Sequence, residues 1–552
     1  MSKRLAITIS GAVSLGSYEA GVLYEVLDAL AQHNSDPKTT DDEKIFVDVL
    51  TGASAGGMTA TIAAQKLLFE AGSLTDPYKN SFYQPWVADV SLDALLTFQP
   101  GEDHTQSLFS SKLIEQIADR HMTVRYHGAT TPARRQHPAA ADTIQLGLAL
   151  ANLNGVDFSR PVKGGRSFTY TRHKDQLRIG LDAGDPSHDT PKKWLPLRDA
   201  AISCGAFPIA FRAKELIRLE SEYPARFLVP FVPPVQTFTY TDGGLFQNEP
   251  LGMAKDFVDG IDDHRNNESR FYLFVAPGAK SGSRETQFSS STATVLRTTW
   301  RMAMSIFAQS RFQDWIMAEK VNDQVAVFNR KALALRESLG AAPDASYFIS
   351  ADTLRPAAAA LLDVLYRPGG IIKESRGDAW ARLRHQFATE YDQLAASKGQ
   401  GTADVWIDAI LAFETAAELG QRDEMAIYGI TATDAELASE NLSAFGGFFD
   451  RRFRDHDYLV GREKAQAWLL SQRSAATGEI GPIRFTPKAL PVRQNLGNLE
   501  VRDLPESSRR HFRQRVIDRA DDVLTEMKFP GPVIFAIRNL FIKPQLNKLL
   551  EL

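Results

Sequence analysis

The sequence predicts an α/β fold with a mainly helical C-terminal region. Two β-type apolar runs, residues 5–9 and 45–50, each lead through a loop of small residues into a pattern typical of a helix. A third β-type run covers residues 271–275, and we expect it to be the last core strand of the α/β part, because residues of high helix propensity dominate beyond it. We therefore expect an α/β domain over residues 1–285 and a mainly helical region over 295–552 that packs on it.

The first strand–loop–helix unit opens the chain. The apolar run 5–9 is followed by the small-residue loop 10–16, and apolar residues then recur at helical spacing over 22–30. A loop that joins a strand to a helix in this way presents backbone N–H groups that suit an oxyanion. We therefore regard the loop as a candidate anion site.

The same N-terminal segment has a competing interpretation. Lys3 and Arg4 before an apolar stretch are also typical of a signal peptide. We disfavour that interpretation because Thr8 and Ser10 interrupt the apolar stretch and no clean small-x-small cleavage site follows.

The second unit contains the sequence Gly-Ala-Ser-Ala-Gly-Gly at residues 52–57, with Ser54 at its centre. Small residues on both sides permit a sharp turn between strand and helix, which exposes the serine hydroxyl at the start of the helix. The first free N–H groups of that helix then point back at the serine. A bare Gly-x-Ser-x-Gly match is more often an ordinary tight turn, so the pattern needs support from the rest of the chain.

A third segment supplies a carboxylate. The β-type run over residues 238–242 ends in Asp242, and Gly243 and Gly244 follow. An aspartate before two glycines is usually a turn former. Here it also offers a base for Ser54, which would otherwise lack one.

Together the three segments resemble the patatin-like phospholipases, a family of lipid acyl hydrolases with a Ser–Asp dyad. Residues 200–211 resemble a small-residue and proline segment of the same family, and the resemblance covers roughly residues 1–280. It assigns the following roles: catalytic, Ser54 and Asp242; oxyanion hole, Gly11, Ala12 and Val13; nucleophile elbow, Gly52 and Gly56; aspartate motif, Gly243 and Gly244.

The resemblance also implies a fold and an activity. The expected fold is a three-layer α/β/α domain with a central mixed, mostly parallel sheet. The expected activity is cleavage of lipid or phospholipid acyl esters, of phospholipase A or lysophospholipase type. Ser54 would form an acyl-enzyme and Asp242 would act as general base, with no cofactor and no metal ion.

The glycine-rich loop departs from the family pattern. Ala12 and Val13 follow Gly11 where the family typically has further glycines, and Leu15 occupies the position of a basic residue. Backbone N–H groups remain, but Ala12 and Val13 resist positive φ angles. The altered loop motivates one alternative, a catalytically weak lipid-binding regulatory protein. A second alternative is an acyltransferase or thioesterase that uses the same dyad with a different acceptor.

A histidine could in principle complete a triad, but no motif surrounds any of the candidates. They lie in polar or charged segments: His127, His137, His173, His188 and His264. We expect each to be an exposed or locally satisfied side chain, so the predicted base is the carboxylate.

Composition excludes several classes of protein. The net charge of −4 argues against general nucleic-acid binding. The single cysteine, Cys204, excludes an intramolecular disulfide and a cysteine-rich metal site. No run of eighteen apolar residues occurs, so we expect no transmembrane helix and a cytoplasmic location. The oligomeric state stays open.

Two C-terminal segments carry open alternatives. Residues 445–462 are rich in arginine and aromatic side chains. They either contact a phosphate headgroup or form an internal salt-bridge network. We favour the network because the segment carries both positive and negative side chains, which usually pair with one another. Residues 529–544 are apolar and basic and include three prolines. They either make peripheral membrane contact or form a docked C-terminal helix.

Overall fold

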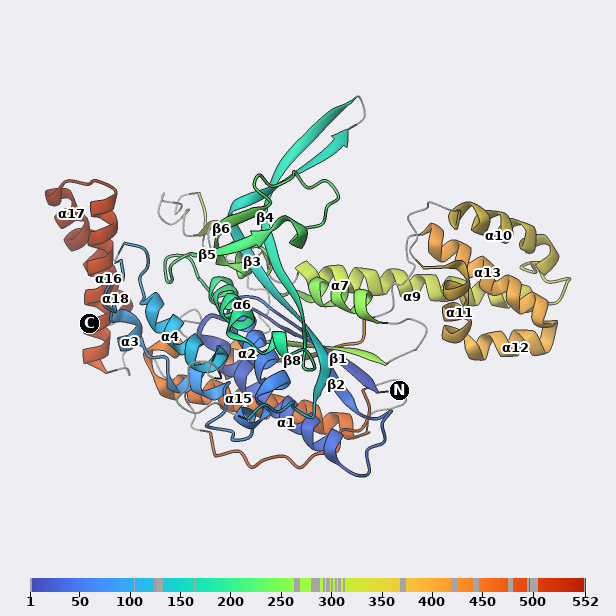
Figure 1. Cartoon of the computed structure of the whole chain (residues 1–552), viewed down its shortest axis with the longest axis horizontal. Coiled ribbons are helices and arrows are strands. Elements are labelled where there is room, and N and C mark those ends of the chain that lie inside the picture. Colours follow the sequence, from blue (N-terminus) through green and yellow to red (C-terminus); the bar gives the residue numbers. More distant parts are fainter. Residues whose placement is uncertain are drawn as a thin grey trace. The chain divides into compact units, whose positions relative to one another are not determined.

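The computed structural model of the chain is shown in Figure 1. It describes residues 2–103, 105–123, 125, 133–162, 165–262, 269–278, 288–290, 293, 298, 301–302, 305, 309–310, 313–367, 374–417, 425–439, 446–474, 480–493, 496, 505–550 and 552. The polar residues 280–291, for which the sequence favours a loop or hinge between the two expected domains, lie mostly outside these ranges.

The chain forms two compact units that are not contiguous in sequence. The first, here called the sheet unit, contains residues 2–258, 269–314 and 427–552, and the helical unit contains residues 259–268 and 315–426. As domains, the ranges 1–285 and 295–552 stay a prediction.

The sheet unit is built around a mixed, mostly parallel sheet, as predicted. Its strands run in the order β5-β6-β3-β2-β1-β7-β8, and β4 pairs with β3 outside this path. The strands are β1 Lys3–Ile9, β2 Ile45–Gly52, β3 Ala140–Val162, β4 Arg166–Asp182, β5 Lys214–Leu219, β6 Val235–Asp242, β7 Arg270–Ala276 and β8 Ile427–Thr431. Pairing is parallel from β3 through β2, β1 and β7 to β8, and antiparallel between β3 and β4, β3 and β6, and β5 and β6.

One expectation about the sheet is wrong. We expected the strand at 271–275 to be the last of the α/β part, but β8 pairs in parallel with β7, with Val275 opposite Ile430. A strand of five residues inside a helix-rich stretch carries little sequence signal of its own. It becomes a strand because it completes the edge of an existing sheet.

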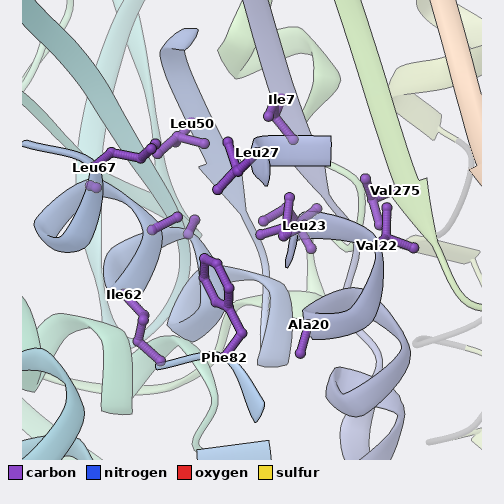
Figure 2. Close-up of a cluster of buried hydrophobic side chains, with 14 of the residues drawn as sticks. Ile7, Ala20, Val22, Leu23, Leu27, Leu50, Ile62, Leu67, Phe82 and Val275 are labelled. Carbon is purple, nitrogen blue, oxygen red and sulfur yellow. The ribbon is translucent and has the colours of Figure 1, made fainter. Parts of the chain in front are cut away.

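Helices cover both faces of the sheet, which confirms the predicted layers. Apolar residues of α1 Gly16–Ser35, α2 Ala55–Phe69, α6 Pro191–Cys204 and α15 Arg451–Ser471 share one core with alternate residues of the strands. Figure 2 shows part of this core, with Leu23 and Leu27 of α1 near Ile7, Leu50 and Val275 of the strands. On the other face, Met253 of α7 Leu251–Ile261 packs against Ala53 and Ala149.

Helix α15 belongs to the core of the sheet unit. A Cβ atom at Gly21 of α1 would collide with the carbonyl oxygen of Tyr458, and one at Gly461 would collide with that of Tyr18. The two backbones therefore touch where the helices cross. Beside this crossing, buried Arg462 pairs with Glu25 at 2.6 Å. This arrangement favours the internal salt-bridge interpretation of residues 445–462.

Beyond residue 313 the chain is largely helical, as predicted. The helical unit has its own core, in which buried Trp406 donates to the Ala332 carbonyl oxygen at 2.9 Å. The remaining principal helices are α3 Leu92–Leu96, α4 Ser111–Met122, α9 Gln313–Gly340, α10 Ala351–Leu365, α11 Arg376–Gln386, α12 Ala388–Lys398, α13 Gln400–Ala416, α14 Gly446–Phe449, α16 Glu506–Glu526, α17 Gly531–Ile537 and α18 Lys543–Leu550. Among the residues described, no helix combines the length and apolar character needed to span a bilayer.

Candidate active site

Ser54 lies in a strained turn between β2 and α2. Strand β2 ends at Gly52 and α2 begins at Ala55, and Ser54 between them has a φ of 51°. A positive φ is uncommon for a residue with a side chain and persists only where the surroundings enforce it. They do so here, because a Cβ at Gly52 would collide with the Gly56 carbonyl and a Cβ at Gly56 with the Ser10 carbonyl. The two predicted elbow glycines therefore meet a steric requirement.

The structure brings Ser54 and Asp242 into direct contact. The Ser54 hydroxyl donates a hydrogen bond of 2.6 Å to Asp242 Oδ2. Asp242 ends β6 and pairs with Leu150 of β3, so the sheet fixes its position next to the end of β2. Ser54 is 7% exposed and Asp242 is 1% exposed, so water has little access to the pair.

Burial changes the basicity of Asp242. Removal from water raises the pKa of its carboxyl group from 3.8 to about 7, against the opposing effects of the Ser54 hydroxyl and the Gly244 N–H. That N–H donates to Asp242 Oδ1 at 2.7 Å. Gly243 allows the turn, because a Cβ there would collide with the Ala149 carbonyl oxygen. A base with a pKa near neutrality is partly deprotonated at physiological pH and still binds a proton well, which is what general base catalysis requires.

The predicted oxyanion loop lies beside Ser54, but its three N–H groups differ. The Gly11 N–H donates to the Asn248 carbonyl oxygen at 3.0 Å and is therefore occupied in this conformation. Ala12 and Val13 donate none of the backbone hydrogen bonds described, and they stand at the start of the 3₁₀ turn η1 Val13–Leu15. Ala12 has a φ of −138°, so the loop does without the positive φ angles that glycines would allow.

Sequence analysis assigned no role to Asn248. This buried side chain donates from Nδ2 to the Gly11 carbonyl oxygen at 3.4 Å. Its Oδ1 lies so close to Gly11 that a Cβ there would collide with it, and a Cβ at Gly244 would lie 2.7 Å from it. Asn248 thus joins the loop after β1 to the turn after β6. The sequence shows Asn248 between two other polar residues, Gln247 and Glu249, and does not reveal that its partner is Gly11 in the loop after β1.

An apolar pocket opens from Ser54. It has a volume of about 90 Å³ and is lined by residues of α2, α4, the turn after α6 and α14. Its apolar lining residues include Met58, Ile62, Trp86, Ile114, Ile117, Ala118, Met122, Ile202, Phe207, Phe211 and Phe448. Charged residues also line it, among them Glu115 and Lys214, which form an ion pair of 2.5 Å. The sequence did not predict the pocket, because its wall comes from segments between residues 54 and 448.

The Ser54 hydroxyl bonds to Asp242, whereas His121, which pairs with Asp89 at 2.6 Å, lines the same pocket. His137, His173 and His188 bond to backbone groups elsewhere, and His127 and His264 lie outside the described ranges. Burial raises the pKa of the Cys204 thiol well above its usual value, so it stays protonated. Its sulfur packs so close to Gly57 that a Cβ there would collide with it.

A strained serine, a buried carboxylate partner and an apolar pocket have the geometry of a serine hydrolase site. Residues 7–255 match the family model described as patatin-like phospholipase. A protein of Sinorhizobium fredii (strain NBRC 101917 / NGR234), named "Uncharacterized protein y4iI", is 22% identical over 545 residues, covering 84% of this chain. The chain spans 64% of that relative's length. Because of the family match, residues 7–255 are assigned to a patatin-like phospholipase domain, and the chain has an additional C-terminal region. The patatin-like phospholipases are serine hydrolases that act on lipids.

Proposed function

We propose that the protein hydrolyses acyl esters of phospholipids or lysophospholipids through a Ser54 acyl-enzyme, with Asp242 as general base. The observation that carries the proposal is the 2.6 Å hydrogen bond from the Ser54 hydroxyl to Asp242. The patatin-like phospholipase match over residues 7–255 and the apolar pocket beside Ser54 support a lipid substrate.

In the acylation step, Asp242 Oδ2 takes the proton of the Ser54 hydroxyl as the oxygen attacks the ester carbonyl carbon. The carbonyl oxygen gains negative charge, which the N–H groups of Ala12 and Val13, and of Ala55 at the start of α2, would stabilise. The tetrahedral intermediate then expels the alcohol, which takes the proton from Asp242. The acyl group stays on the Ser54 oxygen.

In the deacylation step, a water molecule gives a proton to the Asp242 carboxylate and attacks the acyl carbon. The bond between that carbon and the Ser54 oxygen breaks, and Ser54 recovers a proton from Asp242. The fatty acid leaves, and the enzyme returns to its starting state. Asp242 thus acts as base and then as acid in each half of the cycle, a role that a pKa of about 7 permits.

The pocket suggests how the substrate is held. Its apolar walls on α2 and α4 suit a hydrocarbon chain, whose burial contributes about 0.8 kcal/mol per CH₂ group. A bound chain would place its ester next to Ser54. Water would be excluded from the walls, which keeps the environment of Asp242 dry and its basicity high.

The C-terminal tail supports membrane contact as part of this proposal. In the described part of the tail, α17 and the following turn η11 Arg538–Ile542 have no buried residue. Phe535, Leu540 and Phe541 are each more than half exposed, with Lys543 next in the chain. Apolar side chains beside basic ones suit the surface of an anionic bilayer.

Labelling with a serine-directed fluorophosphonate tests the assignment. The wild type should react and Ser54→Ala should not, while both remain folded by circular dichroism. A mixed lipid extract treated with each protein should then show free fatty acids with the wild type alone. A folded wild type that neither reacts nor releases fatty acid would rule out hydrolysis, and acyl transfer to another alcohol in place of release would indicate an acyltransferase.

A further inference from the structure

The β3–β4 hairpin extends far beyond the body of the sheet (Figure 1). Leu150 of β3 pairs with Asp242, and β3 then continues to Val162, which pairs with Arg166 of β4. Because β3 bulges between Ala151 and Val156, β4 covers the same span in only nine steps, from Asp175 to Arg166, so at about 3.3 Å per residue the projecting part is roughly 30 Å long. It leaves the sheet at the edge where Ser54 and Asp242 lie, because Leu148 of β3 pairs with Gly52, two residues before Ser54.

The pairing register gives this hairpin two different faces. Residues directly opposite one another in an antiparallel pair project to the same side. One side carries the pairs Val156–Arg172, Phe158–Tyr170, Arg160–Phe168 and Val162–Arg166. The other carries Asp157–Thr171, Ser159–Thr169 and Pro161–Ser167. All the aromatic and basic side chains between 156 and 172 in these pairs lie on the first side, here called the arginine–aromatic face.

The inner part of the arginine–aromatic face is covered and its outer part is bare. Val156 and Phe158 are buried against the segment around Tyr223 and Phe227. Toward the tip, Phe168 is 62% exposed and Val162 is 50% exposed. The rings of Phe158, Tyr170 and Phe168 stack in sequence, with centroids 5.8 and 6.2 Å apart, so the exposed ring continues an ordered row.

The arginines of this face lie in a stretch of sequence without acidic residues. Residues 158–174 contain no aspartate or glutamate, although the whole chain has a net charge of −4. Arg160 lies over the ring of Phe227 at 5.1 Å and Arg172 over Phe158 at 4.5 Å. Within the described ranges, none of the ion pairs involves Arg160, Arg166 or Arg172. The face therefore combines uncompensated positive charge with exposed apolar groups.

We infer that the outer part of the arginine–aromatic face docks the protein on an anionic phospholipid surface. Arg160 and Arg166 would contact lipid phosphate or carboxylate groups, and Val162 and Phe168 would enter the headgroup region. Charge complementarity selects this occupant, since positive charge and apolar groups share one side of the ribbon while hydroxyl groups occupy the other. A docked hairpin holds the sheet edge that carries Ser54 toward the lipid. The inference rests on the proposed function for its substrate, but docking itself does not require Ser54.

Vesicle sedimentation tests the inference without catalysis. In a Ser54→Ala background, the protein should bind vesicles of phosphatidylcholine mixed with phosphatidylserine far better than vesicles of phosphatidylcholine alone. Replacing two basic residues, Arg160→Gln and Arg166→Gln, should weaken binding by about 30-fold. Phe168→Ser should weaken it further. The matched control changes the opposite face, Ser167→Ala and Thr169→Ala, and should bind like the parent.

Three outcomes would overturn the inference. They are undiminished binding by the double arginine variant, equal binding to neutral and anionic vesicles, and equal loss in the opposite-face control. Binding of single-stranded RNA through the same arginines, without vesicle binding, would assign the face to nucleic acid instead. In a Ser54 background the arginine variant should still hydrolyse a soluble short-chain ester at the parent rate. Failed vesicle binding with intact ester hydrolysis refutes docking alone, whereas vesicle binding without any hydrolysis refutes the proposed function alone.

Discussion

Gly11 donates its N–H to the carbonyl oxygen of Asn248 at 3.0 Å, so the loop after β1 is tied to the turn that follows Asp242. The side chain of Asn248 strengthens the connection, because Nδ2 donates to the Gly11 carbonyl oxygen. The loop that carries the candidate oxyanion donors is therefore held by one residue of the turn after Asp242. A shift of the loop would separate Ala12 and Val13 from the position that charge reaches during attack by Ser54.

Asn248→Ala should impair turnover more than substrate binding. The variant keeps the backbone bond but loses the side-chain bond, so the loop loses its fixed position. We expect kcat to fall by roughly 10- to 100-fold with KM little changed, since one oxyanion donor is typically worth about 10²–10³ in rate. Steady-state kinetics on a soluble ester measure this split.

Asn34→Ala is the matched control, because the Asn34 side chain bonds to the Ile45 carbonyl oxygen at 2.8 Å, away from Ser54. It should lower the melting temperature and spare kcat. If Asn248→Ala lowers stability and leaves kcat intact, Asn248 has only a structural role.

Asp242→Asn should strongly reduce turnover and yet stabilise the protein above neutral pH. The pKa of Asp242 is about 7 in the folded state and about 3.9 when unfolded, so the unfolded chain binds fewer protons between these values. Ionisation of Asp242 thus lowers the free energy of unfolding as pH rises from about 4 to 7. The loss reaches at most roughly 4 kcal/mol. Asparagine does not ionise, so the Asp242→Asn variant does not lose this stability as pH rises.

Thermal unfolding at pH 8 and pH 5 measures the effect. The variant should melt higher than the wild type at pH 8, and the difference should narrow at pH 5. We expect its turnover to fall by roughly 10³-fold. A variant that is less stable than the wild type at both pH values would show that Asp242 is ionised at no net cost.

The reactivity of Ser54 should rise with pH through about 7. Asp242 accepts the Ser54 proton only as a carboxylate, and burial places its pKa at about 7. The rate of fluorophosphonate labelling should therefore be low at pH 5 and reach a plateau above pH 8. This readout avoids any titration of the substrate. A rate that is flat from pH 5 to pH 8 would contradict the elevated pKa.

Filling the pocket should shift the preferred acyl chain length. Ala118 is buried on α4 and lines the pocket, so Ala118→Leu occupies part of its volume of about 90 Å³. We expect kcat/KM for a dodecanoyl ester to fall by about tenfold, in line with the loss of one or two buried CH₂ groups. The butanoyl ester should be unaffected. Ala357→Leu on the exposed side of α10 is the control and should change neither.

The C-terminal tail should contribute to membrane binding independently of the hairpin. Phe535→Ser combined with Leu540→Ser removes two apolar side chains that are each more than half exposed. In the Ser54→Ala background we expect severalfold weaker vesicle binding, which adds to the effect of the arginine variant because the two sites are separate. Sedimentation with the same vesicles measures this. Unchanged binding would restrict membrane contact to the hairpin.

The sequence alone predicted the features that depend on near neighbours. The turn at Ser54 follows from Gly52 and Gly56, which lie two residues before and two residues after the serine and carry no side chain. The strands at 5–9 and 45–50 follow from short β-type apolar runs, and the mainly helical character beyond residue 313 follows from propensity. The pairing of Ser54 with Asp242 was predicted through the family resemblance, and in the structure the Ser54 hydroxyl oxygen lies 2.6 Å from Asp242 Oδ2.

Tertiary structure decided everything that depends on which distant surfaces meet. The pKa of Asp242 is a consequence of burial, which the local sequence of a turn does not reveal. Asn248 bonds to Gly11 and β8 pairs with β7 because the fold brings these distant segments together. For the same reason Met58 and Phe448, which are far apart in the sequence, both line the pocket. The arginine–aromatic face exists only in one pairing register, since a shift of one residue between β3 and β4 would mix its two sides.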